Sequence, residues 1–492
     1  MTAQSTTEYG NVENYVGGSW RAPSGEDGQT LVNPATGDEI GYVGFSTPRD
    51  VEEAVVAGQT AFEEWRKRPV EERIQPLFEY KNLLEDHQEE LARLLVEDHG
   101  KTLDEARGEL RRGIENVEVA CGAPTLLQGG HVQYAAPGID ETAVRQPLGV
   151  FAAITPFNFP GMIPLWFLPY AVATGNAFIL KPSEQDPLVP RRMIELAAEA
   201  GFPEGVVQFV NGSVETVHAI LDHDGIEGVS FVGSTPVART IYEKGAGNGK
   251  RVQAQGGAKN HVIVTETADL AFAAEKAVSS ALACSGERCL ANDLVCVEDP
   301  VYDEVLDLVV AEAEREVVGN GLDEETTVGA LITPDHEETV RNYVETGIQE
   351  GADLVVDGRD VTVEGHEDGN FLGPCIFRDV TSDMVIAREE VFGPILGLMP
   401  VADLDEAIAV MNESDFGNAA SLFTGRGADA QQFRHEAEAG NLAVNAGTAA
   451  PMAFFHFGGE KDSFFGDLHA QAEDVVRFYT DERVYIERWP DR

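Results

Sequence analysis

Residues 228–238 read GVSFVGSTPVA, a short apolar strand followed directly by a turn and the start of a helix. Gly233 permits a tight turn, and Ser234 or Thr235 can cap the following helix, with Pro236 in its first turn. The free N–H groups and the dipole of such a helix start attract the phosphates of a nucleotide. The segment has no G-x-G-x-x-G pattern, so a capped helix with a purely structural role explains it equally well.

The chain on either side of this segment alternates between predicted strands and helices. Such a β-α-β-α-β order implies a parallel sheet with right-handed crossovers and therefore an α/β fold. A second alternation runs from Asn260 to about residue 440 and predicts a separate α/β domain. The predicted strands are 149–154, 177–180, 206–210 and 228–232, and the predicted helices are 50–66, 70–95, 101–119, 190–200 and 214–221.

A polar turn follows the second of these strands. It reads Lys181-Pro182-Ser183-Glu184 and so lies at the carboxyl end of a buried strand, where α/β folds bind ligands. Lys181 and Glu184 can hydrogen-bond the hydroxyls of a ribose, and an acid there repels a 2′-phosphate, which favours NAD over NADP. A surface turn with an ion pair is the alternative.

The composition excludes several classes of function. The 492 residues are enough for two or three domains, and 85 acidic against 35 basic residues give a formal charge of −50. Such a chain repels phosphate backbones, so we expect no nucleic-acid partner. Because about 1 M salt reduces the Debye length to ~3 Å and screens this self-repulsion, the charge predicts a protein of a high-salt cytoplasm.

The cysteines and the apolar segments indicate the cellular location of the protein. Five cysteines at irregular spacing predict neither a disulfide framework nor a zinc site, and the histidines form no H-E-x-x-H motif, so we expect no metal. The start, MTAQSTTEYG, has no signal-peptide pattern, and the apolar stretch 161–180 is interrupted by two prolines and Asn176. We therefore expect a cytoplasmic protein with no membrane partner.

The segment Ala281–Asn292, ALACSGERCLAN, contains the best candidate nucleophile. Cys289 follows Arg288, whose charge favours a thiolate and lowers the pKa of the thiol. Cys284 lies in an apolar, helix-like context and is predicted to be a core residue. Because most cysteines are inert core residues, the local sequence alone leaves this role open for Cys289 too.

Thiolate attack on an aldehyde creates an oxyanion that needs hydrogen-bond donors. Asn158, within Thr155-Pro156-Phe157-Asn158-Phe159-Pro160, follows a predicted strand in a rigid loop. Its side-chain amide and the backbone N–H of Cys289 are candidate donors. A turn asparagine between two aromatic residues is the alternative.

Together these segments resemble the aldehyde dehydrogenase superfamily over nearly the whole chain. The resemblance lies in PFNFP, LKPSE, FVGSTPVA, GERC and EVFGP, the last at residues 390–394. It implies a Rossmann-type NAD domain (1–123 and 147–259), an α/β catalytic domain (260–461), and a small oligomerisation flap with a C-terminal arm (124–146 and 462–492). It also implies Cys289 as nucleophile, Asn158 as oxyanion donor, and a cofactor site formed by Thr155, Phe157, Lys181, Glu184, Gln185, Ser234, Gly256 and Glu390.

A branch of this superfamily is also indicated. GELRRGIENVEVACG, GGAKNH, PMAFF and KDSFFGDLHA resemble the CoA-acylating methylmalonate-semialdehyde dehydrogenases. Hydrolytic members carry a Glu base where this chain has Gln255, and an amide cannot take a proton from water near neutral pH. The acyl group then needs a better nucleophile, and we expect the thiol of coenzyme A in that role.

The substrates of that branch carry a carboxylate, with which guanidinium groups pair well. Arg112 and Arg288 match the arginines that the branch uses for it, whereas Arg111 is a neighbour easily confused with Arg112. We expect oxidation of methylmalonate or malonate semialdehyde through a thioester on Cys289, giving propionyl-CoA or acetyl-CoA. Two positions depart from the pattern, Glu287 in place of Gln and Glu460 in place of Trp.

Three other functions remain open at this point: a hydrolytic semialdehyde dehydrogenase, a non-catalytic protein of the same fold, and a metal-dependent enzyme. The resemblance also implies a homo-oligomer, either a dimer or a tetramer.

Overall fold

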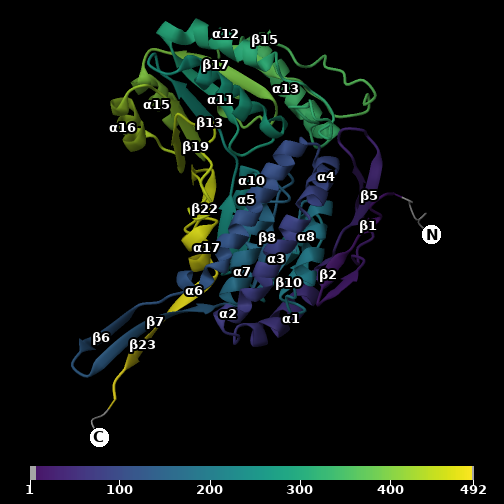
Figure 1. Ribbon diagram of the computed structural model, residues 1–492, viewed down its shortest axis with the longest axis vertical. Coiled ribbons are helices and arrows are strands. Elements are labelled where there is room, and N and C mark those ends of the chain that lie inside the picture. The colour runs from purple at the N-terminus through teal and green to yellow at the C-terminus, as the bar shows by residue number, and fades with distance from the viewer. Residues whose placement is uncertain (1–6, 490–492) are drawn as a thin grey trace.

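The computed structural model describes residues 7–489. The first six residues, which include most of the stretch used for the signal-peptide prediction, lie outside the described residues, as do residues 490–492. Two large α/β bodies are stacked on each other, and a thin β-hairpin extends away from the lower one (Figure 1).

The lower body is built on an eight-stranded sheet. Its five central strands are parallel, and antiparallel strands complete both edges. In spatial order the strands are β22 (Phe464–Gly466), β12 (Arg251–Gln255), β11 (Ile226–Val232), β8 (Val150–Ile154), β9 (Ala177–Lys181), β10 (Val207–Phe209), β2 (Asn14–Val16) and β3 (Ser19–Arg21).

Helices cover both faces of this sheet because its strands are apolar on both sides. Phe151 and Ala153 of β8 belong to one core cluster, and Val150, Ala152 and Ile154 belong to another. The first cluster contains α3 (Gln75–Asp86), α4 (Gln88–His99), α5 (Leu103–Cys121), α7 (Leu168–Thr174) and α8 (Leu188–Glu199). The second contains α1 (Pro48–Trp65), α9 (Val214–Asp222) and α10 (Thr235–Gly247).

The upper body repeats this arrangement around a seven-stranded sheet. Leu294 and Cys296 face one layer of helices, whereas Val295 and Val297 face the other. In spatial order the strands are β15 (Asp353–Val356), β16 (Cys375–Arg378), β17 (Ile395–Val401), β14 (Asn292–Glu298), β13 (Asn260–Val264), β19 (Ala419–Phe423) and β20 (Asn441–Val444). The helices are α11 (Leu270–Leu282), α12 (Tyr302–Ala313), α13 (Pro334–Glu350), α14 (Val385–Arg388), α15 (Leu404–Asn412) and α16 (Gly427–Glu436).

The extended hairpin is formed by β6 (His131–Ala136) and β7 (Ile139–Pro147), to which β23 (Thr480–Glu487) adds a third antiparallel strand. Except for Thr480, its side chains are half-buried or exposed. The chain reaches it through the short α6 (Ala123–Leu126) and leaves the lower body through α17 (Ala472–Phe478). The division into domains expected from the sequence stays a prediction.

The smaller elements complete the architecture. A three-stranded sheet lies near the N-terminus, and one short pair of strands joins the two bodies. These are β1 (Asn11–Val12), β4 (Gly28–Val32) and β5 (Glu39–Gly44), then β18 (Phe416–Gly417) with β21 (Glu460–Lys461), and finally the 3-10 helices at 163–166 and 299–301, with a non-helical turn at 283–286.

The predicted strands and most predicted helices are confirmed, but the single helix expected over 70–95 is wrong. The chain instead forms α2 (Val70–Arg73), α3 and α4. Pro76 accounts for the first break, because a proline has no N–H to donate and its ring clashes with the carbonyl four residues earlier.

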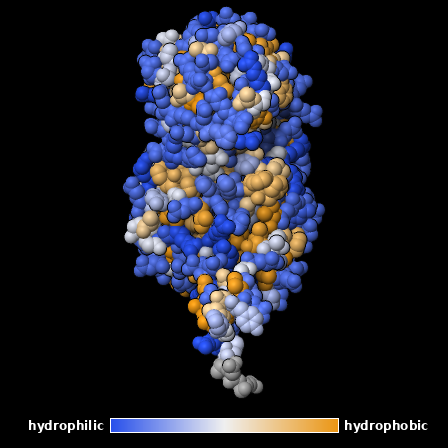
Figure 2. All heavy atoms as spheres, turned by 90° about the vertical axis from the view of Figure 1, so that its left-hand side faces the viewer, coloured by the Kyte–Doolittle hydropathy of each residue, from blue (hydrophilic) through white to orange (hydrophobic). Residues whose placement is uncertain are grey.

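Much of the face in Figure 2 is hydrophilic, and apolar residues gather in patches on its middle part. No helix within residues 7–489 is long and apolar enough to cross a membrane. The cytoplasmic location stays a prediction.

Candidate active site

Four loops leave the carboxyl edge of the lower sheet beside one another. Ile154 of β8 is paired with Lys181 on one side and Phe231 on the other, and Val232 is paired with Gln255. The strand order reverses at β8, since β9 and β10 lie to one side and β11 and β12 to the other. Ligands of open α/β sheets bind at such a switch point, so the fold itself brings the predicted cofactor residues together.

The polar residues of these loops are arranged differently from a simple helix cap. Lys181 forms an ion pair with Glu184 at 2.7 Å. Ser234 is the N-cap residue of α10, but its side chain makes no capping hydrogen bond. The hydroxyl of Thr235 accepts from Gly257 N at 2.8 Å and donates to Asp462 O at 3.0 Å. The expected side-chain cap is therefore wrong. Thr235 instead links the loop that contains Gly257 to the loop that contains Asp462.

The residues at this edge fit a dinucleotide. The hydroxyl of Thr155 and Oε1 of Gln185 are buried without a hydrogen-bond partner. A Cβ at Gly256 would lie 2.6 Å from the carbonyl of Asp462, and one at Gly257 would lie 2.5 Å from the carboxylate of Glu390. The two glycines thus allow this loop to pack closely against Asp462 and Glu390, and the unpartnered groups are available to a polar ligand.

Phe157 is fixed by aromatic packing beyond the end of β8. Its ring centroid lies 6.1 Å from His99, 6.2 Å from His336 and 5.8 Å from Phe392. The loop that carries Phe157 and Asn158 is therefore held from both bodies.

A sharp turn precedes Cys289. Cys284, Ser285 and Gly286 all have left-handed backbone angles, with φ of 52°, 54° and 78°. The helical context expected for Cys284 is therefore wrong, because α11 ends at Leu282. Such angles are rare for residues with side chains and occur where surrounding contacts enforce them, often at functional sites.

Two asparagines, one at the start of β13 and one just before β19, hold the carbonyl of Cys289. The amide of Asn260 donates to Cys289 O at 2.9 Å and to Ala291 O at 2.8 Å. The amide of Asn418 donates to the same Cys289 oxygen at 2.7 Å. Sequence reasoning missed both residues, and only the pairing of β13 with β14 and β19 brings them to the cysteine.

The thiol of Cys289 is half-buried. Burial raises its pKa to about 12, while Arg288 acts in the opposite direction and Glu390 adds to the rise. Arg288 therefore acts on the pKa in the expected direction, but in the ligand-free protein desolvation outweighs this single cation.

A buried ion pair fixes the loop that carries Asn158. The Lys101 ammonium donates to the backbone carbonyl of Asn158 at 2.7 Å and is paired with Glu109. The other carboxylate oxygen of Glu109 accepts from Gly161 N at 2.7 Å and Met162 N at 3.2 Å. The side chain of Asn158 is only 3% exposed, and its Oδ1 has no partner. No local pattern marks Lys101 or Glu109, and the sequence prediction missed them.

Cys289, Arg288 and Arg112 line one cavity of about 310 Å³. Its walls are mainly apolar and come from both bodies. They include Phe159, Met162, Trp166, Leu290, Pro451, Ala453 and Phe457.

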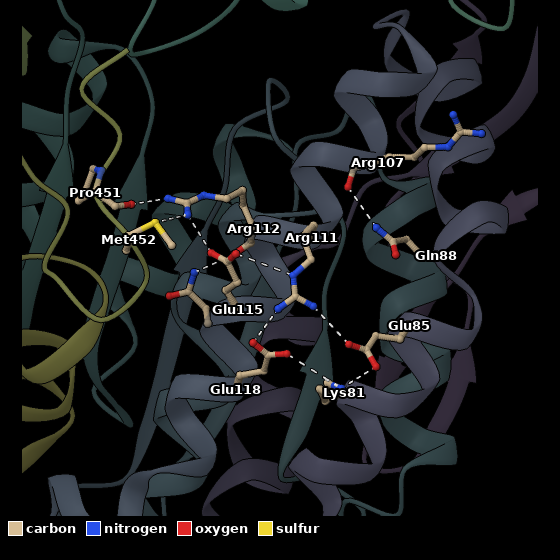
Figure 3. A network of polar contacts seen from close by, with 11 residues as sticks. Lys81, Glu85, Gln88, Arg107, Arg111, Arg112, Glu115, Glu118, Pro451 and Met452 are labelled. Carbon is tan, nitrogen blue, oxygen red and sulfur yellow. Dashed lines mark hydrogen bonds and ion pairs between the residues drawn. The ribbon is translucent and has the colours of Figure 1, made fainter. Parts of the chain in front are cut away.

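The two neighbouring arginines of α5 have different surroundings (Figure 3). Arg111 donates to Glu85 at 3.2 Å and to Glu118 at 2.6 Å on the helix surface. Arg112 lines the cavity, where it donates to Glu115 at 2.8 Å and to the carbonyl of Pro451. The structure therefore places Arg112 in the cavity and Arg111 outside it, among surface carboxylates.

Gln255 and Glu390 lie where the two bodies meet. Both side-chain amide atoms of Gln255 are buried without a hydrogen-bond partner. Burial, followed by the charge of Asp293, raises the pKa of Glu390 to about 8. Within residues 7–489, no cluster of three or more His, Cys, Asp or Glu is placed to hold a metal ion.

The two departures from the expected pattern lie in contrasting places. Glu287 is fully buried and accepts from Ile332 N at 3.1 Å, and burial raises its pKa well above the usual value. Glu460 is exposed on β21 and does not line the cavity of Cys289.

Comparison with known proteins agrees with this geometry. The model of the aldehyde dehydrogenase family matches residues 20–485. The chain belongs to the aldehyde dehydrogenase family. Malonate-semialdehyde dehydrogenase 2 of Bacillus thuringiensis subsp. konkukian is 48% identical over 479 residues, which cover 97% of this chain and 98% of the relative. The expected α/β aldehyde dehydrogenase fold is confirmed.

Two solved structures are similar over almost their full length. A protein of Sinorhizobium meliloti, described as a methylmalonate-semialdehyde dehydrogenase complexed with NAD, has a TM-score of 0.97 and 40% identity, covering 99% of each chain. Methylmalonate-semialdehyde dehydrogenase of Oceanimonas doudoroffii has a TM-score of 0.96 and 42% identity, covering 98% of this chain and 99% of the other.

Proposed function

We propose that this protein oxidises malonate or methylmalonate semialdehyde with NAD and transfers the acyl group to coenzyme A. The observation that carries the proposal is the cavity in which Cys289 lies with Arg112 and Arg288. A semialdehyde of this kind has an aldehyde at one end and a carboxylate at the other. One cavity thus offers a nucleophile for the aldehyde and cations for the carboxylate.

The first step is attack of Cys289 on the aldehyde carbon. The amide of Asn158 and the backbone N–H of Cys289 donate to the resulting oxyanion. Since burial raises the pKa of the thiol to about 12, its proton must pass to solvent before the sulfur attacks. Arg288 favours the thiolate.

The proposed cofactor site lies along the carboxyl edge of the lower sheet. Lys181 and Glu184 would hold the adenosine ribose, and Glu390 the ribose of the nicotinamide. Bound NAD supplies the hydride acceptor. Oxidation of the cysteine adduct leaves an acyl thioester on Cys289. The remaining proposed contacts are Thr155, Phe157, Gln185, Ser234 and Gly256.

Transfer to coenzyme A follows from the identity of residue 255. A Gln has no basic group to activate water, and both amide atoms of Gln255 lack partners. The thioester therefore reacts with the thiol of coenzyme A and not with water. After the substrate carboxylate leaves as CO₂ or bicarbonate, the products are acetyl-CoA or propionyl-CoA, together with NADH.

We also infer that the chain forms a homo-oligomer, either a dimer or a tetramer. Val132 and Tyr134 on β6 and Val484, Tyr485 and Ile486 on β23 are exposed. An exposed apolar sheet on an extended arm is typical of an interface. Mass measurement in solution tests this inference.

The high-salt origin remains a proposal that rests on the charge of −50. At low ionic strength the surface carboxylates repel one another, and molar KCl screens them.

The deciding experiment is an NADH assay with malonate and methylmalonate semialdehyde in molar KCl, with and without coenzyme A. We expect multiple turnovers only with coenzyme A and a single burst of NADH without it. Full turnover without coenzyme A would favour a hydrolytic enzyme. The absence of any NADH with either substrate would exclude the proposed substrates.

A further inference from the structure

Glu287 has no part in the proposed mechanism, although it is fully buried and lies two residues before Cys289. Its backbone N–H donates to Cys284 O at 2.9 Å and closes the turn that precedes the nucleophile. Its carboxyl Oε1 accepts from Ile332 N at 3.1 Å, whereas Oε2 has no hydrogen-bond partner within residues 7–489. A buried polar atom without a partner is costly, and native proteins rarely retain one without a use for it.

One histidine from each body lies against this carboxyl group. Nε2 of His99, the last residue of α4, is 4.0 Å from Oε2 of Glu287. Nε2 of His336, in the first turn of α13, is 3.5 Å from Oε1 and donates to Phe392 O at 2.8 Å. Burial raises the pKa of Glu287 and lowers the pKa of both histidines, so it favours the uncharged form of all three side chains. The cluster is therefore a polar contact between the two bodies in which burial disfavours charge.

The same two histidines pack on Phe157, which lies in the loop proposed to bind the cofactor. The centroid of the Phe157 ring is 6.1 Å from that of His99 and 6.2 Å from that of His336. Both nitrogens of His99 lack a hydrogen-bond partner in the part of the chain that the structure describes. Glu287 thus lies against both rings that pack on Phe157, and it reaches them from the turn that carries the nucleophile.

We propose that Glu287 is a positioning residue that holds His99 and His336 against Phe157 and so orders the cofactor loop for NAD. This inference rests on the proposed cofactor site. A protonated carboxyl group offers an acceptor and a donor. The acceptor binds Ile332 N, and the donor is available to an imidazole that has no other partner. A glutamine offers an oxygen and an N–H group in the same two places, whereas a leucine of similar size offers neither.

The test measures the Kd of NAD for the wild type, Glu287→Leu and Glu287→Gln by equilibrium dialysis without an aldehyde. Without this contact the loop is correctly ordered in a smaller fraction of molecules, which predicts a rise of about tenfold in the Kd for Glu287→Leu. Glu287→Gln keeps both hydrogen-bonding groups and should stay within about threefold of the wild type. The KM of malonate semialdehyde should change by less than about threefold in either variant, because Glu287 lies outside the wall of the Cys289 cavity.

Two further variants make the result decisive. His99→Leu removes a ring that lies against both Glu287 and Phe157, so it should raise the Kd as Glu287→Leu does, and it carries the test if Glu287→Leu fails to fold. Ser285→Ala removes another buried hydrogen bond of the same turn, to Gly329 O at 2.9 Å, and should leave the Kd unchanged.

The inference is overturned if Glu287→Leu and His99→Leu leave the Kd unchanged, or if Ser285→Ala raises it equally. It is also overturned if Glu287→Gln binds NAD as weakly as Glu287→Leu. A wild type that does not bind NAD would instead refute the proposed cofactor site.

Discussion

The ammonium group of Lys101 donates a hydrogen bond of 2.7 Å to the backbone carbonyl of Asn158, and both residues are buried. Thr102 caps α5, so Lys101 lies just outside the helix, while Glu109 reaches it from inside. The candidate oxyanion donor is thus positioned by a charge pair that makes no contact with the aldehyde carbon itself.

Lys101→Met should destabilise the protein and slow the reaction, because Glu109 keeps its buried charge without a partner. The expected loss is about 3–5 kcal/mol of unfolding free energy, measured in urea, with a larger fall in kcat than in KM. Lys81→Met is the matched control, since Lys81 is paired with Glu85 at the surface, where such pairs contribute about 0–1 kcal/mol. Equal effects of the two variants would contradict this assignment.

Cys289→Ala should abolish formation of NADH with every aldehyde and leave the fold intact. The reason is that no thioester can form without the sulfur. Cys121→Ser, at the end of α5 and outside the cavity, should retain activity. An active Cys289→Ala protein would refute the covalent mechanism, and an inactive wild type would indicate a non-catalytic member of the family.

The reactivity of Cys289 in the cofactor-free protein should rise steadily with pH. Because burial raises its pKa to about 12, the thiolate fraction and the rate of alkylation by iodoacetamide should grow about tenfold per pH unit from pH 6 to 9. Arg288→Leu should lower the rate at every pH, since the cation that favours the thiolate is lost. A plateau near pH 7 in the wild type would show that the thiol ionises readily without ligands.

Arg112→Leu should lower kcat/KM for malonate semialdehyde by about 100-fold and barely affect propanal, because only the first substrate has a carboxylate to pair. Arg111→Leu is the matched control on the same helix, since Arg111 binds Glu85 and Glu118 at the surface (Figure 3). The same loss in both variants would mean that Arg112 acts through the helix and not through the substrate.

Thermal stability should increase from salt-free buffer to 2 M KCl, because the net charge of −50 is screened. Differential scanning calorimetry measures the Tm. Solutes that are excluded from the protein surface stabilise any folded protein, so an uncharged osmolyte at equal osmolality serves as the control. A Tm independent of KCl would rule out a requirement for salt.

Much of the fold and part of the candidate site could be predicted from local sequence. Strands such as 228–232 are apolar on both faces, and this pattern alone requires helices on both sides of the sheet. Asn158 and Cys289 lie within short distinctive segments, so they could be named before any contact was known.

The sequence by itself determined the α/β architecture, the candidate nucleophile and its oxyanion donor, because strand patterns and short motifs are properties of neighbouring residues. The resemblance favoured Arg112 over Arg111, but only the tertiary structure placed Arg112 in the cavity, where its partner Pro451 lies 339 residues away in the chain. It alone brought Asn260 and Asn418 to the site. It also decided the balance between burial and Arg288 at Cys289, because desolvation depends on everything packed around the sulfur and not on the residue beside it in the chain.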